Sequence, residues 1–194
     1  MPPASDSPNP LQGARARLRH WPDSELAPFA AMNADADVMR HLGAHLSGDE
    51  RDATGQRIRA HLDSHGFGLR VLDAPGLGFA GFVGINPQVP FELPLAGIAA
   101  QPHETGWRLA KAAWGHGDAA EAATLALRHG FKTLRLPQIV SFTAVTNTAS
   151  PAVMQRIGLV RPAEFDHPRL AEGQPLRRHV LYAQDAPFAG AQPS

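Results

Sequence analysis

Trp114-Gly115-His116-Gly117-Asp118-Ala119 leads directly into the alanine-rich segment Ala119–Leu127, and no other stretch of this chain says as much about it. Two glycines separated by one residue let the backbone turn tightly and point several N–H groups in one direction. The helix predicted next adds its free N-terminal amides and the positive end of its dipole. Since His103–Leu109 reads as a strand, the unit is strand, glycine turn and helix. It predicts a site for a diphosphate, with a solvated turn as the alternative.

The composition is that of one ordinary globular domain. The chain has 194 residues, of which 43% are hydrophobic and 19% charged, and this is enough to bury a core. We expect a single domain over residues 14–185, a disordered N-terminal tail over residues 1–13 and a mobile C-terminal tail over residues 186–194. The tails are rich in proline and small polar residues.

Charge and cysteine content exclude several classes of function. A formal net charge of +0 gives no basic field for nucleic acid, and the absence of cysteine excludes disulfides, thiolate zinc sites and a cysteine nucleophile. The first residues lack the basic start and apolar core of a secretion signal, and no apolar run has membrane-spanning length. The sequence therefore predicts a cytoplasmic protein with neither nucleic acid nor membrane as partner.

Periodicity and turn residues predict an α+β fold with a mixed sheet, antiparallel in its early part. Ser47 and Glu50 fit a capping box, and Asp23 or Ser24 fits a helix cap. A proline-rich loop over residues 87–102 could border a ligand site. The predicted strands cover residues 16–21, 67–72, 79–85, 103–109, 138–145 and 178–183; the predicted helices begin near residues 24, 36, 48, 119 and 150.

Several motifs, in this order and spacing, resemble the GNAT superfamily of N-acetyltransferases, in the branch of the RimJ and RimL ribosomal-protein N-terminal acetyltransferases. The resemblance runs from about Ala16 to Tyr182. The segments that resemble the family are Ala16-Arg17-Leu18-Arg19 with Trp21, Asn33–Leu42, Phe82-Val83-Gly84, Glu104–Leu109, Trp114–Ala122, Asn147–Ser150 and Val153–Leu159.

The resemblance implies a GNAT-type, mainly antiparallel sheet with helices on both faces. Its fourth and fifth strands, here 103–109 and 138–145, would splay apart around acetyl-CoA as co-substrate. Backbone groups of one strand would pair with the pantetheine arm, and the glycine turn would hold the diphosphate. The residues implied to contact the cofactor are Trp107, Arg108, Leu109, Trp114, Gly115, His116, Gly117, Asp118, Ala119, Ala120, Asn147 and Arg156.

Two positions depart from the family pattern. Asp118 stands where a tyrosine or aliphatic residue is usual, and it would place a carboxylate beside a polyanion. We expect this side chain to point away and cap the helix. Thr105 stands where isoleucine is usual, which is a milder change.

Acetyl transfer to an amine needs a base for the ammonium proton, a donor for the oxyanion and a donor for the leaving sulfur. Glu104 is the candidate base, with an ion-paired strand residue as the alternative and His103 in reserve, since neighbouring strand residues face opposite sides. Ser150 is the candidate donor to the sulfur, although Ser-Pro also fits a helix N-cap. Tyr182 fits core packing or the rim of the site better than acid catalysis.

His61 and His65 have metal-like spacing but lack a third ligand, so no metal is expected. The basic segment 165–179 is either a solvated loop, or a wall of the acceptor site or a dimer contact, so a homodimer is possible.

The predicted function is acetyl transfer to a primary amine, on a protein N-terminus or a small molecule, by direct attack in a ternary complex. The alternative is a catalytically weak acetyl-CoA sensor.

Overall fold

The computed structural model describes residues 9–43, 47–93 and 95–187. Within these residues the strands form one eight-stranded sheet in the order β1-β2-β3-β4-β5-β6-β8-β7. The elements are β1 (Leu11–Gln12), β2 (Arg17–Arg19), η1 (Asp23–Glu25), α1 (Leu26–Ala34), α2 (Ala36–Met39), α3 (Gly48–His65), β3 (Leu69–Ala74), β4 (Gly78–Gln88), β5 (His103–Leu109), η2 (Lys111–Ala113), α4 (Asp118–Lys132), β6 (Gln138–Ala144), α5 (Ala149–Arg156), β7 (Val160–Asp166) and β8 (Arg178–Asp185).

The sheet is antiparallel except between β5 and β6, which run parallel and are connected through α4. A parallel pair needs a long crossover, and α4 supplies it. Only His103–Ile139 and Glu104–Val140 pair across the two strands, so from Thr105 onward β5 and β6 separate. The predicted fold class is confirmed, including the divergence of the strands at 103–109 and 138–145.

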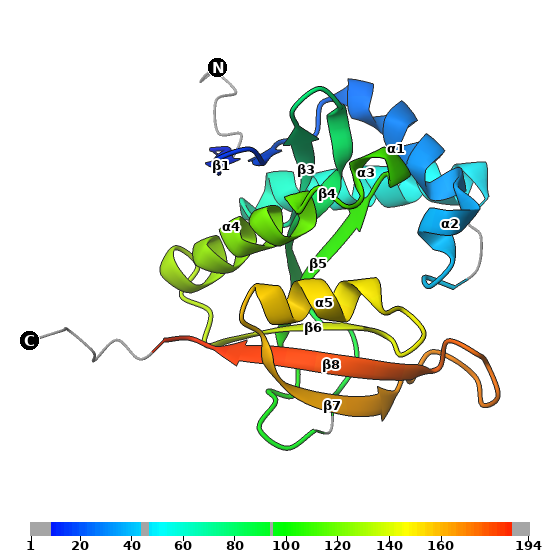
Figure 1. Cartoon of the computed structure of the whole chain (residues 1–194), viewed down its shortest axis with the longest axis vertical. Coiled ribbons are helices and arrows are strands. Elements are labelled where there is room, and N and C mark those ends of the chain that lie inside the picture. The colour runs from blue at the N-terminus through cyan, green and yellow to red at the C-terminus, as the bar shows by residue number, and fades with distance from the viewer. Residues whose placement is uncertain (1–8, 44–46, 94, 188–194) are drawn as a thin grey trace, which may run out of the picture.

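Helices cover both faces of the sheet (Figure 1). Because side chains alternate along a strand, neighbouring residues enter different cores. Val71 packs with Trp21 and with residues of α1 and α3, whereas the next residue, Leu72, packs with α4 and α5. A third cluster lies under residues 89–98 and joins them to β6, β7 and β8. None of the described helices combines the length and apolarity that crossing a bilayer requires.

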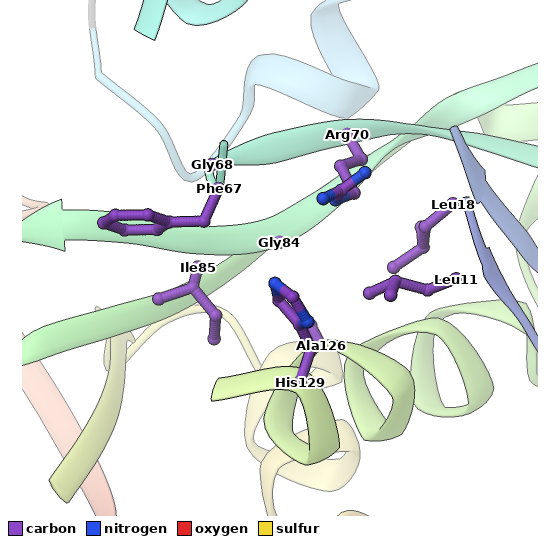
Figure 2. Close-up of a pocket in the computed structure, with 9 residues that line it drawn as sticks. All are labelled: Leu11, Leu18, Phe67, Gly68, Arg70, Gly84, Ile85, Ala126 and His129. Carbon is purple, nitrogen blue, oxygen red and sulfur yellow. The ribbon is translucent and has the colours of Figure 1, made fainter. Parts of the chain in front are cut away.

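A small cavity remains where α4 packs on β3 and β4 (Figure 2). It measures about 10 Å³, which is room for about one water molecule. The Arg70 side chain lies across it from His129 and donates hydrogen bonds to the carbonyl oxygens of Asn9 and Gly66. This cavity is too small for a substrate.

Two helix starts follow the sequence prediction and one departs from it. Ser47 and Glu50 form the predicted capping box at the start of α3. By contrast, the segment Asp23–Glu25 is a 3-10 turn ahead of α1, and neither Asp23 nor Ser24 caps a helix with its side chain. The helix after Asp35 begins at Ala36, as expected, and ends at Met39.

Strand β7 is absent from the sequence prediction. Its Pro162 argues against a strand, but a proline is tolerated at an edge or a bulge, and β7 is both the edge strand and irregular between Val160 and Ala163. Arg161 takes a φ of +64° at this bulge. The basic segment is therefore a β7–β8 hairpin with a loop at 167–177.

Part of the expected N-terminal tail is ordered, because Leu11–Gln12 pair with β2. Residues 1–8 and 188–194 of the two tails lie outside the described residues.

Candidate active site

A cleft of about 1070 Å³ opens where β5 and β6 separate. Its size is at the upper end of pockets that enclose small-molecule ligands. One wall is β5 with the start of α4, and the other is β6 with α5. Residues of α2 and α3 also line the cleft. The divergence of two parallel strands thus produces a cleft large enough for a small-molecule ligand.

Every second residue of β5 directs its backbone N–H and C=O groups toward this cleft. The Ala110 amide donates to the carbonyl of Ala80 on β4, so Arg108, two residues earlier, also directs its backbone groups to β4. The backbone groups of Trp107 and Leu109 point the other way, into the open wedge. The Leu109 carbonyl there accepts a hydrogen bond from Trp114 Nε1 at 3.0 Å, which seats the partly exposed Trp114 ring at the rim of the cleft.

The glycine turn adopts the backbone conformation that its sequence predicts. Gly115 and Gly117 have φ values of +81° and +84°, in the left-handed region that glycine tolerates. Asp118 begins α4, whose first amides have no partner within the helix. Gly115 and Gly117 to Ala120 line the cleft. His116 does not line it; its carbonyl accepts a hydrogen bond from Arg15 Nη2 at 2.8 Å instead.

Asp118 does not cap α4, contrary to expectation, because no side chain caps this helix and Gly117 holds the cap position. The Asp118 carboxylate is buried and forms an ion pair with Arg15 at 3.3 Å. Glu121 accepts hydrogen bonds from the backbone amides of Arg15 and Ala16, and the first of these lowers the pKa of Glu121. Arg15 therefore neutralises the charge of the Asp118 carboxylate. The sequence does not indicate this ion pair, because Arg15 lies 103 residues from Asp118.

Glu104 lies on the face of β5 that looks into the cleft, and it is the last residue of β5 that pairs in the parallel ladder. Burial raises the pKa of its carboxyl to about 7, and a hydrogen bond of 3.0 Å from Asn86 Nδ2 opposes that rise. Sequence reasoning missed Asn86, which reaches Glu104 from the neighbouring strand β4. His103 points to the opposite face, against Phe67, and does not line the cleft.

Asn147 and Ser150 meet at the start of α5. Asn147 Nδ2 donates to the hydroxyls of Thr143 and Ser150, both at 3.0 Å, and Asn147 Oδ1 accepts from the Ser150 amide at 3.3 Å. Ser150 is not the helix cap that Ser-Pro predicted, because α5 begins one residue earlier, at Ala149. The Ser150 hydroxyl is thus held in the cleft wall without a capping role.

The remaining candidates lie at the edges of the site. Arg156 is exposed on α5 at the rim of the cleft. Tyr182 is buried in the core and accepts a hydrogen bond from Gln155 Nε2 at 3.1 Å, as expected for a packing residue. His61 and His65 stack at 4.2 Å between ring centroids, and no cluster of three metal-ligating side chains occurs among the described residues.

Comparison with known proteins places this geometry in context. Residues 15–160 match the family described as acetyltransferase (GNAT) domain. The fold is similar to that of a GNAT-family acetyltransferase from Bacillus anthracis, with a TM-score of 0.74, 19% identity and coverage of 92% of this chain and 99% of that one.

Two further solved structures contain coenzyme A. RimJ of Mycobacterium smegmatis in complex with CoA-disulfide has a TM-score of 0.72 at 20% identity, over 92% of this chain and 88% of that chain. Spermidine N-acetyltransferase of Vibrio cholerae, in complex with CoA and spermine, has a TM-score of 0.67 at 16% identity, over 90% and 97% of the two chains. At such identities the likeness establishes the fold.

Proposed function

The chain belongs to the GNAT acetyltransferase family, and from this membership we propose that it acetylates a primary amine by direct attack in a ternary complex. It is an N-acetyltransferase, and acetyl-CoA is its co-substrate. The acceptor proposed here is a small-molecule amine or a protein N-terminus. The observation that carries this proposal is a carboxyl group with a pKa of about 7, that of Glu104, in the wedge between two diverging strands.

The cleft suits a long cofactor with a diphosphate. Trp107 and Leu109 would pair through their backbone with the pantetheine arm, as an added strand does. The amides from Gly115 to Ala120 would hold the diphosphate, with Trp114 at the rim of the cleft. Asn147 and the exposed Arg156 would contact the pantetheine and the phosphates. The Arg15–Asp118 ion pair supports this assignment because it offsets the carboxylate beside the phosphate site.

Glu104 would take the proton of the acceptor ammonium, directly or through water. A base works best when its pKa lies near the operating pH, and burial gives Glu104 that value. The Asn86 amide holds the carboxylate toward the cleft. A β5 amide that points into the wedge would stabilise the developing oxyanion. The Ser150 hydroxyl, oriented by Asn147, would donate to the leaving sulfur.

An uncompensated carboxylate at Asp118 would favour a catalytically weak sensor, and the ion pair with Arg15 counts against that alternative. Thiol release measured with acetyl-CoA and a panel of amines and N-terminal peptides tests the proposed function, with Glu104→Gln and Ser150→Ala as comparison variants. We expect turnover by the wild type and its loss in Glu104→Gln. Cofactor binding without turnover on any amine would instead favour the sensor.

Four finer assignments are predictions from the sequence. The motifs at Asn33–Leu42 and Trp114–Ala122 favour the RimJ and RimL branch, and acetylation of ribosomal-protein N-terminal peptides tests this. A homodimer and a cytoplasmic location remain predictions; light scattering and cell fractionation test them. The domain over residues 14–185 contains the whole family match, and expression of that segment tests its limits.

A further inference from the structure

The guanidinium of Arg108 has no counter-ion among the residues that the structure describes. Its side chain leaves β5 on the same face as Glu104 and Gly106, and it lines the cleft. Arg108 Nη1 donates to Asn33 Oδ1, and the guanidinium carbon lies 5.4 Å from the centroid of the Phe82 ring. Its Nε is buried without a hydrogen-bond partner, and none of the described carboxylates forms an ion pair with this arginine. Burial lowers the pKa of Arg108 to about 10, which leaves it charged at neutral pH.

The surroundings of Arg108 do not compensate its charge. We call the part of the cleft bounded by α2, α3, β4 and the Glu104 face of β5 the acceptor half. The carboxylate of Asp37 there is already paired with Arg40 and Lys111. Glu104 is near half-protonation at neutral pH because its pKa is about 7. Exposed Arg57 adds another positive charge to the lining. The acceptor half is therefore positive, and a polycationic amine would be repelled.

The spacing along β5 lets one molecule reach both groups. Glu104 and Arg108 are four residues apart on one face, which is about 13 Å between Cα atoms, and both side chains reach inward from there. Gly106 lies between them, and a Cβ at this position would come 3.4 Å from Asn86 Nδ2. Because Gly106 has no side chain, the surface of β5 between Glu104 and Arg108 is open to a ligand.

We propose that Arg108 is the specificity-determining residue of the acceptor half and pairs with a carboxylate carried by the amine that is acetylated. This proposal rests on the proposed function. A desolvated guanidinium gains most from an anion that it can hydrogen-bond, and here the substrate supplies that anion. The positive field also favours the neutral form of the amine, which is the nucleophilic form.

The test compares matched acceptors that differ only in carboxylate against carboxamide. One arm uses γ-aminobutyrate and its amide; the other uses an N-terminal peptide with aspartate at its second position and the same peptide with asparagine. We expect the wild type to prefer the carboxylate by about 10- to 100-fold in kcat/KM, mainly through KM, in at least one arm. The arm that shows the preference identifies a free amino acid or an acidic N-terminus as the source. Equal use of both members in both arms overturns the proposal.

Variants separate charge recognition from a structural role. We expect Arg108→Gln to bring the ratio of kcat/KM for the carboxylate to kcat/KM for the carboxamide close to one, and Arg108→Lys to keep part of the preference. Arg19→Gln removes another half-buried strand arginine, outside the cleft, and is expected to keep the preference. An equal loss on both acceptors in Arg108→Gln contradicts the proposal.

Calorimetry of each acceptor on the CoA-loaded wild type gives a readout that needs no turnover and does not depend on how any variant folds. Tighter binding of the carboxylate without any acetylation would refute the proposed function and support the role of Arg108. Acetylation of both acceptors with equal kcat/KM and equal affinity would support the proposed function and refute the role of Arg108.

Discussion

At the scale of single residues, the ionisation of Glu104 is expected to govern the pH dependence of catalysis. Its pKa is raised to about 7 by burial, and only the ionised form can accept a proton. We therefore expect kcat/KM to rise with pH and to level off above about pH 7. Glu104→Gln should lower kcat/KM roughly 10²- to 10⁴-fold and remove this limb of the profile. Steady-state kinetics between about pH 5 and pH 9 measure both effects.

The same carboxyl group affects stability with a definite sign. Between the unfolded pKa of 4.5 and the folded value of about 7, the folded protein holds more of this proton. The contribution of Glu104 to the free energy of unfolding therefore falls as pH rises through that window. Relative to the wild type, Glu104→Gln should gain about 1–3 kcal/mol between pH 4 and pH 8, as followed by denaturant unfolding. A difference between the two proteins that is independent of pH would argue against the raised pKa.

Gly117 provides a second prediction at this scale. Its φ of +84° strains any residue with a Cβ, and that Cβ would lie 3.4 Å from Arg15 Nη2. We expect Gly117→Ala to weaken CoA binding about tenfold, because the amides after it lose their alignment. Gly173 has nearly the same φ, +82°, with open space around it, so Gly173→Ala is the matched control. Calorimetry should show an unchanged Kd in the control; an unchanged Kd in folded Gly117→Ala would speak against a diphosphate site at this turn.

At the scale of elements, Arg15 connects the N-terminal segment to the start of α4. It reaches the His116 carbonyl and the carboxylates of Asp118 and Glu121. We expect Arg15→Ala to raise the KM for acetyl-CoA about tenfold, because the buried Asp118 carboxylate then faces the phosphates without compensation. Adding Asp118→Asn to Arg15→Ala should restore most of the affinity, and this double-mutant cycle is the measurement.

The control for this prediction is Arg178→Ala. Arg178 is as exposed as Arg15, at 50% against 51%, and pairs with Glu164 on the distant hairpin. It should leave the KM for acetyl-CoA unchanged. Failure of Asp118→Asn to rescue Arg15→Ala would show that Arg15 acts only by holding the backbone of the turn.

At the scale of the whole molecule, the two halves of the sheet meet through two residue pairs, His103–Ile139 and Glu104–Val140. A ligand in the wedge would bridge both halves and bind only the folded chain. At about 100 times its Kd, CoA should add about 2.7 kcal/mol to the free energy of unfolding, or roughly 5–10 °C in Tm. Hydrogen exchange should slow in β5 and in the first turn of α4. Saturating CoA without a shift in Tm would contradict binding in this cleft.

Local sequence predicted those elements whose backbone is specified within a few residues. The left-handed glycines at Gly115 and Gly117, the capping box of α3 and the strand His103–Leu109 all occur as expected. Strand β7 was missed because a proline at position 162 speaks against a strand locally, whereas the sheet edge tolerates it.

The sequence alone thus determined the strand–turn–helix unit and the α+β class, because each depends on periodicity and backbone preferences over short stretches. Glu104 was expected in the cleft from the resemblance to the GNAT superfamily. The tertiary structure alone decided that Arg15 neutralises Asp118 and that Asn86 holds Glu104. It also decided that Ser150 lies beside Asn147 instead of capping a helix, and that Arg108 has no counter-ion within the described part of the chain. Arg15 and Asn86 lie 103 and 18 residues from their partners, and only the packing of the sheet and helices brings such groups together. Charge compensation and pKa depend on these neighbours, so they follow from the folded chain.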